Sequence, residues 1–209
     1  IELDRTVFYY ESGGQPGDTG TLAADDGRKV EITDTRMDRL LGRHVHIPAK
    51  GVTLLAPGDK VTATIDWKRR HRLMRMHTLL HLICATVNAD ITGCQIGMEK
   101  SRIDLNTESK PDKDAIQVHL EELVAKDLTT TAQWITSEEL SAQPELVKTM
   151  SVSPPSGIGK IRLIAVGGVD LQPCGGTHVA SIGEIGRVRV GKIENKGKQN
   201  RRINVHLED

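Results

Sequence analysis

The stretch KRRHRLMRMHTLLHLICATVNA, residues 68–89, decides the fold because it separates two different sequence patterns. It contains neither Gly nor Pro and is rich in Leu, Met and Arg, which predicts a long helix. At helical spacing, one face of this helix would carry Leu73, His77, Leu80, His81, Cys84 and Asn88. Both histidines therefore point the same way.

Upstream of this helix, short β-type runs alternate with turn-forming residues. The runs are RTVFYY, RKVEITDT, HVHIP and KVTATID, and the segment SGGQPGDTG lies between the first two. Runs of this length, separated by Gly, Pro and Asp, are typical of small antiparallel barrels or sandwiches. We expect a small N-terminal antiparallel β-barrel in residues 1–66.

Downstream of residue 67, helical and strand patterns are interspersed. PDKDAIQVHLEELVAKD has apolar residues at helical spacing, and Thr136 with Glu139 predicts a capping box for a short helix. The predicted strands are KSRIDLN, TTTAQWIT, GKIRLIAV, GRVRVGKIE and RRINVHL. The expected fold class is therefore α+β: the N-terminal barrel, then an α+β domain in residues 67–209 with a mainly antiparallel sheet.

Charge and cysteine content narrow the class of protein. Lys plus Arg and Asp plus Glu both total 28, so no global field favours nucleic acid. Residues 1–66 carry 8 basic and 11 acidic side chains, which leaves 28 − 8 = 20 basic and 28 − 11 = 17 acidic side chains for residues 67–209. The second part is the one expected to meet phosphate. Three unevenly spaced cysteines and the lack of a run of ~18 apolar residues predict a cytoplasmic protein with no disulfides and no membrane segment.

Two pairs of potential metal ligands stand out. His77 and His81 are four residues apart on the predicted helix, a spacing that suits one metal ion but also arises by chance. Cys174 and His178 are also four apart, in a turn that contains Pro173 and two glycines. Together the two pairs match the Cys and His sets that bind Zn²⁺.

Alternatives to this ligand set remain open. Cys84 shares the face of His77 and His81 and could replace a ligand, although a small buried hydrophobe is its commoner role. Four protein ligands could also form a purely structural zinc site. The segment HTLLH lacks the Glu of the H-E-x-x-H hydrolases, so the helix offers no adjacent general base.

The segments RMHTLLHLI, CGGTHV, IGEIG and ENKGKQNRRI resemble, in this order, the editing domain shared by alanyl-tRNA synthetase and the AlaX trans-editing proteins. FYYESGGQPGDTG resembles the glycine-rich segment that precedes this domain in medium-length AlaX proteins, although Ser12 stands where the family often has a third glycine. The resemblance covers nearly the whole chain, and it implies a small β-barrel followed by an α+β editing domain.

The resemblance also implies an activity. It implies zinc-dependent hydrolysis of serine, with glycine as a second candidate, from the acceptor end of mischarged tRNA(Ala). The residues that match the family's metal motif, and that we assign to catalysis, are His77, His81, Cys174 and His178. A free-standing protein is favoured over an excised synthetase domain, and a monomer is favoured although the oligomeric state is open.

Further residues are candidates for binding the substrate. Backbone N–H groups of Gly175 and Gly176 could stabilise an oxyanion, and Thr92 or Gln95 could recognise the serine hydroxyl, with solvated loop residues as the alternative. Gly13, Gly14 and Gln15 could form a lid over the entrance. The tRNA-binding candidates are Arg69, Arg70, Arg72, Arg75, Lys192, Lys196, Lys198, Arg201 and Arg202.

Two rival classes fit the same residues. An RNA-binding module could use the four ligands as a structural zinc clamp, and a metalloenzyme could act on a small ester or amide. The RNA-binding module would not release serine from seryl-tRNA(Ala), whereas the editing hydrolase would. The metalloenzyme for a small ester or amide would also act on a truncated substrate that lacks the tRNA body.

Overall fold

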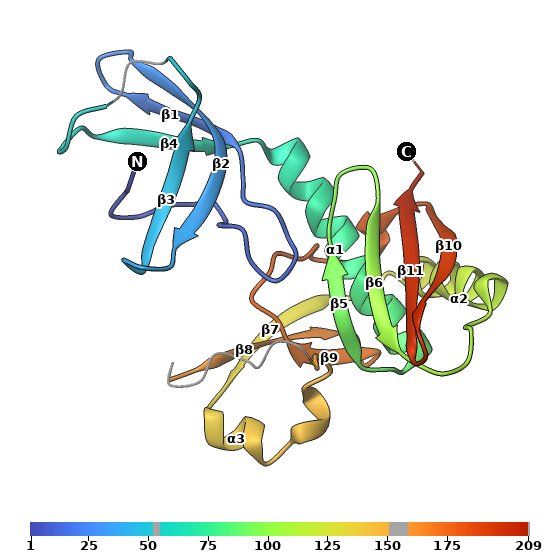
Figure 1. Ribbon diagram of the computed structural model, residues 1–209. Helices are drawn as coiled ribbons and strands as arrows, with labels where there is room; N and C mark the ends of the chain where they lie inside the picture. The colour runs from blue at the N-terminus through green and yellow to red at the C-terminus, as the bar shows by residue number, and fades with distance from the viewer. Residues whose placement is uncertain (52–54, 151–158, 209) are drawn as a thin grey trace. The chain divides into compact units, whose positions relative to one another are not determined.

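The structure is a computed structural model that describes residues 1–51, 55–150 and 159–208. The chain forms two compact units, Ile1–Arg72 and Leu73–Asp209, and the boundary between them falls within the long helix α1, Trp67–Val87 (Figure 1). The carboxylate of Asp66 accepts the backbone N–H of Arg69 and so caps the start of α1. The predicted helix is confirmed, and it ends before Asn88, which adopts a left-handed φ of 52°.

The first unit contains one four-stranded antiparallel sheet. Its strands are β1 (Gly20–Ala24), β2 (Lys29–Asp38), β3 (Arg43–Pro48) and β4 (Val61–Ile65), in the order β3-β2-β1-β4. The buried side chains of Phe8, Leu22, Val30 and Ile32 form its core.

The barrel expected in this unit is not closed among the residues that the structure describes. Closure would require β3 to pair with β4, but the outer edge of β3 is occupied by Ile1, which exchanges two backbone hydrogen bonds of 2.8 Å with His46. The run RTVFYY is not a strand either. The N–H of Tyr9 bonds to the side chain of Asp18, so this segment follows a loop that still buries Phe8.

The second unit contains a four-stranded and a three-stranded sheet, both antiparallel, which confirms the α+β class. The first consists of β10 (Val188–Gly197), β11 (Asn200–Leu207), β6 (Ser101–Asn106) and β5 (Ile91–Gln95), in that order. Its apolar face and the helix α2 (Lys113–Lys126) share one core with α1, built from residues such as Leu79, Leu82, Ile103, Leu120 and Ile203. The side chain of Asp112 caps the N-terminus of α2.

The three-stranded sheet consists of β7 (Thr130–Ile135), β8 (Ile161–Val166) and β9 (Asp170–Pro173). The central strand β8 is apolar on both faces: Ile164 and Val166 belong to the main core, whereas Ile161 and Leu163 pack in a smaller core. The smaller core also contains side chains from α3 (Ser137–Ser141) and the 3₁₀ helix η1 (Pro144–Leu146). The capping box predicted for α3 is present.

A second 3₁₀ helix, η2 (Ile182–Ile185), follows the C-x-x-x-H turn and buries Ile182 and Ile185 in the main core. Among the described residues, no helix combines the length and hydropathy needed to cross a membrane.

Candidate metal centre

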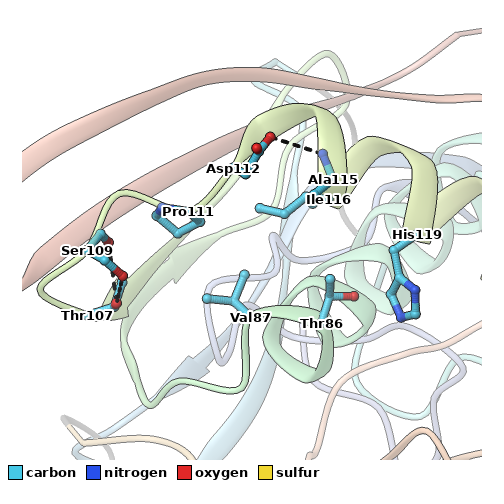
Figure 2. Close-up of a pocket in the computed structure, with 9 residues that line it drawn as sticks. All are labelled: Thr86, Val87, Thr107, Ser109, Pro111, Asp112, Ala115, Ile116 and His119. Carbon is cyan, nitrogen blue, oxygen red and sulfur yellow. Dashed lines mark hydrogen bonds between the residues drawn. The ribbon is translucent and has the colours of Figure 1, made fainter.

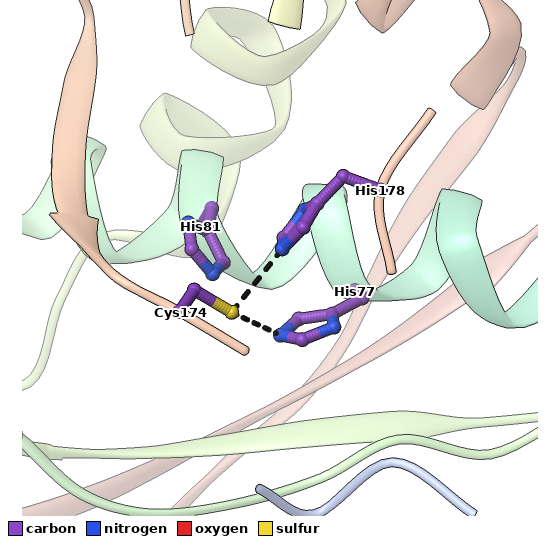
Figure 3. Close-up of side chains that lie close together, drawn as sticks. All are labelled: His77, His81, Cys174 and His178. Carbon is purple, nitrogen blue, oxygen red and sulfur yellow. Dashed lines mark hydrogen bonds between the residues drawn. The ribbon is translucent and has the colours of Figure 1, made fainter. Parts of the chain in front are cut away.

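Four side chains from two distant parts of the sequence meet in the second unit. His77 and His81 project from adjacent turns of α1, and Cys174 and His178 come from the chain that follows β9 (Figure 3). One potential ligand atom from each residue lies within 4.8 Å of the others. The Cys174 Sγ is 3.5 Å from the His77 Nε2 and 3.2 Å from the His178 Nε2. The sequence thus predicted which four side chains come together.

The spacing of these atoms suits a tetrahedral metal ion. With metal–nitrogen bonds of about 2.0 Å and a metal–sulfur bond of about 2.3 Å, tetrahedral angles separate sulfur and nitrogen by roughly 3.5 Å. The two sulfur–nitrogen distances in the structure lie near this value. His77 and His81 are each only 6 % exposed, so the pair is held within the fold rather than on a flexible surface. The group can therefore hold a metal ion.

Arg162 of β8 fixes the turn that carries Cys174. Its guanidinium donates to the carbonyl oxygens of Cys174 at 3.0 Å and Gly176 at 2.7 Å, and its own carbonyl accepts the N–H of Cys174 at 3.1 Å. The N–H of Gly176 donates to the Cys174 Sγ at 3.4 Å. Gly175 is exposed, and a Cβ added there would meet no atom within 4 Å. Of the two predicted oxyanion donors, Gly176 thus already has a partner.

A buried carboxylate orients one of the imidazoles. The Asp170 Oδ2 lies 2.9 Å from the His81 Nδ1, and its Oδ1 accepts from the Lys148 Nζ at 2.9 Å. Gln172 donates to the same carboxylate at 2.8 Å. This arrangement leaves the His81 Nε2 for the metal, since a histidine ligand commonly donates its other N–H to a carboxylate. Asp170 was not predicted from the sequence, although the alternation of side chains along β9 and into the next residue places Asp170, Gln172 and Cys174 on one face.

Thr78 performs the corresponding role for His178. Its hydroxyl lies 3.1 Å from the His178 Nδ1 and also accepts the N–H of Val179 at 3.3 Å. Thr78 is fully buried and follows His77 directly in α1. The hydroxyl therefore ties the loop to the helix and leaves the His178 Nε2 facing the sulfur.

Burial and the mutual contacts of the group shift the pKa values of its members in different directions. Burial alone would lower the pKa of His81, but hydrogen bonds to Asp170 and Cys174 outweigh it and raise that pKa to about 9. Burial would raise the pKa of Asp170, but its contacts with His81 lower it to about 2. Burial would also raise the pKa of the Cys174 thiol, yet the charge of His77 and the bond to His178 hold it well below its usual value. Burial and the neighbouring histidine charges lower the pKa of His178 to about 3. A thiolate at Cys174 and a neutral imidazole at His178 are thus favoured, as metal ligands need, whereas His81 would release its extra proton when a metal binds.

The alternative ligand Cys84 lies elsewhere. It is fully buried in the main core, its Sγ donates to the carbonyl of Ala89 at 3.6 Å, and burial raises the pKa of its thiol to about 12. Cys84 does not belong to the group of converging ligand atoms. Its place in the structure is that of a small core side chain.

The candidates for serine recognition lie on β5. The hydroxyl of Thr92 donates to the Asn200 side chain at 3.3 Å, and the Gln95 side chain accepts from Arg102 at 3.2 Å. Cys94, between them, packs partly buried against the same core as Cys174. The sequence analysis assigned no role to Cys94.

Gly13 and Gly14 form a tight turn in the first unit. Both have positive φ, 57° and 81°, and Ser12 and Gln15 exchange two backbone hydrogen bonds across them, of 3.1 and 2.9 Å. Two consecutive left-handed residues require glycine for a turn of this kind. The side chain of Gln15 is fully buried. The glycine pair is therefore explained by the turn, and its lid role remains a prediction.

Most of the arginines predicted to contact tRNA have protein partners. Arg69 donates to the Gly17 carbonyl at 2.7 Å, Arg70 forms an ion pair with buried Asp18, and Arg75 donates to the Ile185 carbonyl at 2.8 and 3.0 Å.

In the C-terminal hairpin the arginines also have protein partners, whereas the lysines are exposed. Arg202 bonds to both oxygens of Asp104 at 2.7 and 2.8 Å, and Arg201 donates to the carbonyl of Gly197 at 2.9 Å. Lys192 and Lys198 are exposed, as is Lys196, which pairs with Glu194 at 3.1 Å. The lysines are therefore the more available cations of this hairpin.

A separate pocket of about 440 Å³ lies between the end of α1 and the start of α2 (Figure 2). Two of its polar side chains already have partners: Thr86 donates to the Leu82 carbonyl at 2.7 Å, and Asp112 accepts two N–H groups at the start of α2. The pocket contains none of the four converging ligands.

Two family models match the chain. The model described as the second additional domain of threonyl- and alanyl-tRNA synthetases matches residues 161–204, which include Cys174 and His178. A model for class II (A) tRNA synthetases matches residues 1–69. Together with the Cys and His centre, these matches define a protein that shares an additional domain with the synthetases.

Full-length relatives identify the family more closely. The chain is 36 % identical over its whole length to the alanyl-tRNA editing protein AlaX-M of Methanosarcina acetivorans, of which it covers 89 %. It is 35 % identical to the AlaX-M protein of Saccharolobus solfataricus, over 97 % of this chain and 86 % of that protein. It is 28 % identical to the alanine–tRNA ligase of Sulfurisphaera tokodaii, over 93 % of this chain but 22 % of the ligase. The chain belongs to the AlaX-M family of alanyl-tRNA editing proteins, which confirms the resemblance found in the sequence.

Proposed function

We propose that this protein is a zinc-dependent hydrolase that removes serine, and secondarily glycine, from mischarged tRNA(Ala) in trans. The observation that carries the proposal is the convergence of one thiol and three imidazoles within 4.8 Å. The printed names of the AlaX-M relatives, alanyl-tRNA editing proteins, support the substrate class. Zinc is the metal that one thiolate and three imidazoles suit best.

The residues around the ligands prepare the site for this chemistry. When bound, zinc supplies a positive charge that can hold the substrate's amino group or activate water. Asp170 holds the ring of His81, and Thr78 holds the ring of His178. The carboxylate of Asp170 already accepts from His81, Lys148 and Gln172, so it is a poor general base. We infer that the neighbouring ribose hydroxyl of the substrate relays the proton.

Serine selectivity requires a polar partner for the serine hydroxyl. A site that hydrogen-bonds a hydroxyl rejects the analogue that lacks it far better than a site that reads size. Thr92 and Gln95 of β5 are our candidates. For the acceptor stem we propose phosphate contacts with the exposed lysines of the C-terminal hairpin, Lys192 and Lys198. Because charged tRNA is used by ribosomes, we place the activity in the cytoplasm.

Deacylation assays test the proposal. Purified protein with its metal content measured is given tRNA(Ala) charged with serine, glycine or alanine. We expect the serine ester to be cleaved at least about 100-fold faster than the alanine ester. Removal of the metal by a chelator should abolish cleavage, and added Zn²⁺ should restore it.

A second function is favoured by one observation, namely that four protein ligands can complete a tetrahedral coordination sphere. In that case the protein is an RNA-binding module with a structural zinc. An intact, metal-loaded protein that binds tRNA but releases no serine would establish this function and exclude the hydrolase.

A further inference from the structure

An exposed tryptophan lies in the sheet that carries the metal loop. Trp134 of β7 is 59 % exposed. The chain has only five Phe, Trp and Tyr residues, and the other four precede residue 73, so Trp134 is the one large aromatic side chain of the second unit's sequence. An exposed aromatic side chain can serve as a stacking surface for a nucleobase, which makes its surroundings informative.

Strand pairing places Trp134 in line with the metal centre. Trp134 is the direct partner of Arg162 on β8. On the other side of β8, Leu163 pairs with Pro173 and the N–H of Cys174 donates to the Arg162 carbonyl, so Cys174 is the next residue in the same row. Direct partners in an antiparallel sheet present their side chains on one face. Trp134, Arg162 and Cys174 therefore form a row across the sheet.

The face of this row is the face that bears the metal centre. Asp170 and Gln172, which share the face of Cys174, contact His81 of α1. With adjacent strands about 4.8 Å apart, two steps place the backbone of Trp134 about 10 Å from that of Cys174. Arg162 fills the space between them and directs its guanidinium to the Cys174 loop. Trp134 thus offers an aromatic surface on the face of Cys174, two strands away at the edge strand β7.

The substrate has a part that fits this position. An aminoacyl ester on the terminal ribose of tRNA brings one nucleobase close to the metal centre whenever the ester lies there. Every base has a flat face that stacks on an exposed indole without sequence-specific hydrogen bonds.

We propose that Trp134 is the platform on which the terminal base of the acceptor end stacks while the ester lies at the metal centre. The proposal rests on the function proposed above. It makes Trp134 a binding residue that fixes the distance between base and ester. Its loss should weaken substrate binding and leave the hydrolytic step intact.

Steady-state deacylation of seryl-tRNA(Ala) tests this role. In Trp134→Ala we expect KM to rise by about 5- to 150-fold with little change in kcat, which is the scale of one base–aromatic stack. Trp134→Phe keeps a ring and should recover much of the affinity. Gln133→Ala alters the exposed neighbouring residue on the opposite face of β7 and should behave as the unmodified protein. An unchanged KM in Trp134→Ala overturns the proposal.

Tryptophan fluorescence gives a readout that does not depend on hydrolysis. In a Trp67→Phe background Trp134 is the single tryptophan, and an uncharged minihelix ending in CCA should quench it in a saturable manner. A minihelix that lacks the terminal adenosine should not. If the minihelices with and without the terminal adenosine quench the fluorescence equally, the stacking role is overturned, even if the protein releases serine. Adenosine-dependent quenching without any serine release overturns the hydrolase and keeps the base site.

Discussion

Two pairs of histidines in this protein have nearly the same ring spacing but different surroundings. The rings of His44 and His46 on β3 have centroids 5.1 Å apart, and those of His77 and His81 on α1 are 5.2 Å apart. Only the second pair is joined by a thiol and another imidazole. Spacing alone therefore does not make a metal centre.

The partners of the rings explain the difference. His46 bonds to the hydroxyl of Thr6 and the carbonyl of Ile1, both neutral groups, and burial lowers its pKa. His81 instead faces the carboxylate of Asp170, which is itself held by Lys148. A neutral hydrogen-bonded ring is a packing element. A ring polarised by a carboxylate and turned toward a thiol has the surroundings that a metal ligand needs.

The largest expected effect comes from removing the thiolate of Cys174. The histidine pair of β3, His44 and His46 (the strand pair), has no such group beside it among the residues that the structure describes. Cys174→Ala should lose bound metal, with affinity at least about 100-fold weaker, and should lose turnover, because loss of a ligand costs more than loss of an outer partner. Metal analysis and the deacylation assay measure both. Cys84→Ala, the same change on α1 outside the ligand group, is the control. Full metal content in Cys174→Ala would contradict the ligand assignment.

Removing the carboxylate should make His81 resemble the strand pair. Asp170→Asn preserves the shape but not the charge, and we expect metal affinity to fall by about 10- to 100-fold. Competition with a metal-binding dye measures this affinity. Asp104→Asn is a matched control, because Asp104 is a buried carboxylate that pairs with Arg102 and Arg202 rather than with a ligand. Equal losses in both variants would show a general stability effect.

The smallest expected effect concerns pH and the strand pair. Burial lowers the pKa of both His44 and His46, so the unfolded chain binds more protons than the folded one below about pH 6.5. Their contribution to stability is therefore present above that pH and is lost as the pH falls. His46→Gln, which cannot be protonated, should lose less stability on acidification than the unmodified protein. The expected difference in the Tm shift between pH 7.5 and 5.5 is about 2–4 °C.

The unmodified protein and His46→Gln share the same four candidate ligands, so acid release of a bound metal would affect both equally. A Tm shift that is identical in the two would contradict the assignment of acid sensitivity to His46.

The sequence predicted the local features and missed those that depend on distant contacts. The helix of residues 68–89, the capping box at Thr136 and the four ligand candidates follow from spacing along the chain. Asp170 and Arg162 were missed because their roles depend on which strand lies next to which. Asp170 lies in phase with Cys174 in the sequence, but neither its bond to His81 nor the bonds of Arg162 to the Cys174 turn can be foreseen before β8 and β9 are paired.

The open sheet of the first unit shows the same limit. Alternating runs indicate strands, but closure of a barrel depends on what occupies the edges. Here Ile1 pairs with β3, a contact across 45 residues that no local pattern reveals. The arginines show the converse: a cluster of cations in the sequence became salt bridges and carbonyl contacts within the fold.

The short strand β9 and the residue that follows it carry three members of the group at every second position, Asp170, Gln172 and Cys174. Inserting or deleting a single residue there would turn the carboxylate, the amide and the sulfur to the far side of the sheet in one event. Substitutions in β9 remove one group at a time, whereas a change in its length removes all three. To transplant this group to another scaffold, the whole segment would have to be moved so that the same side chains still face the same side of the sheet.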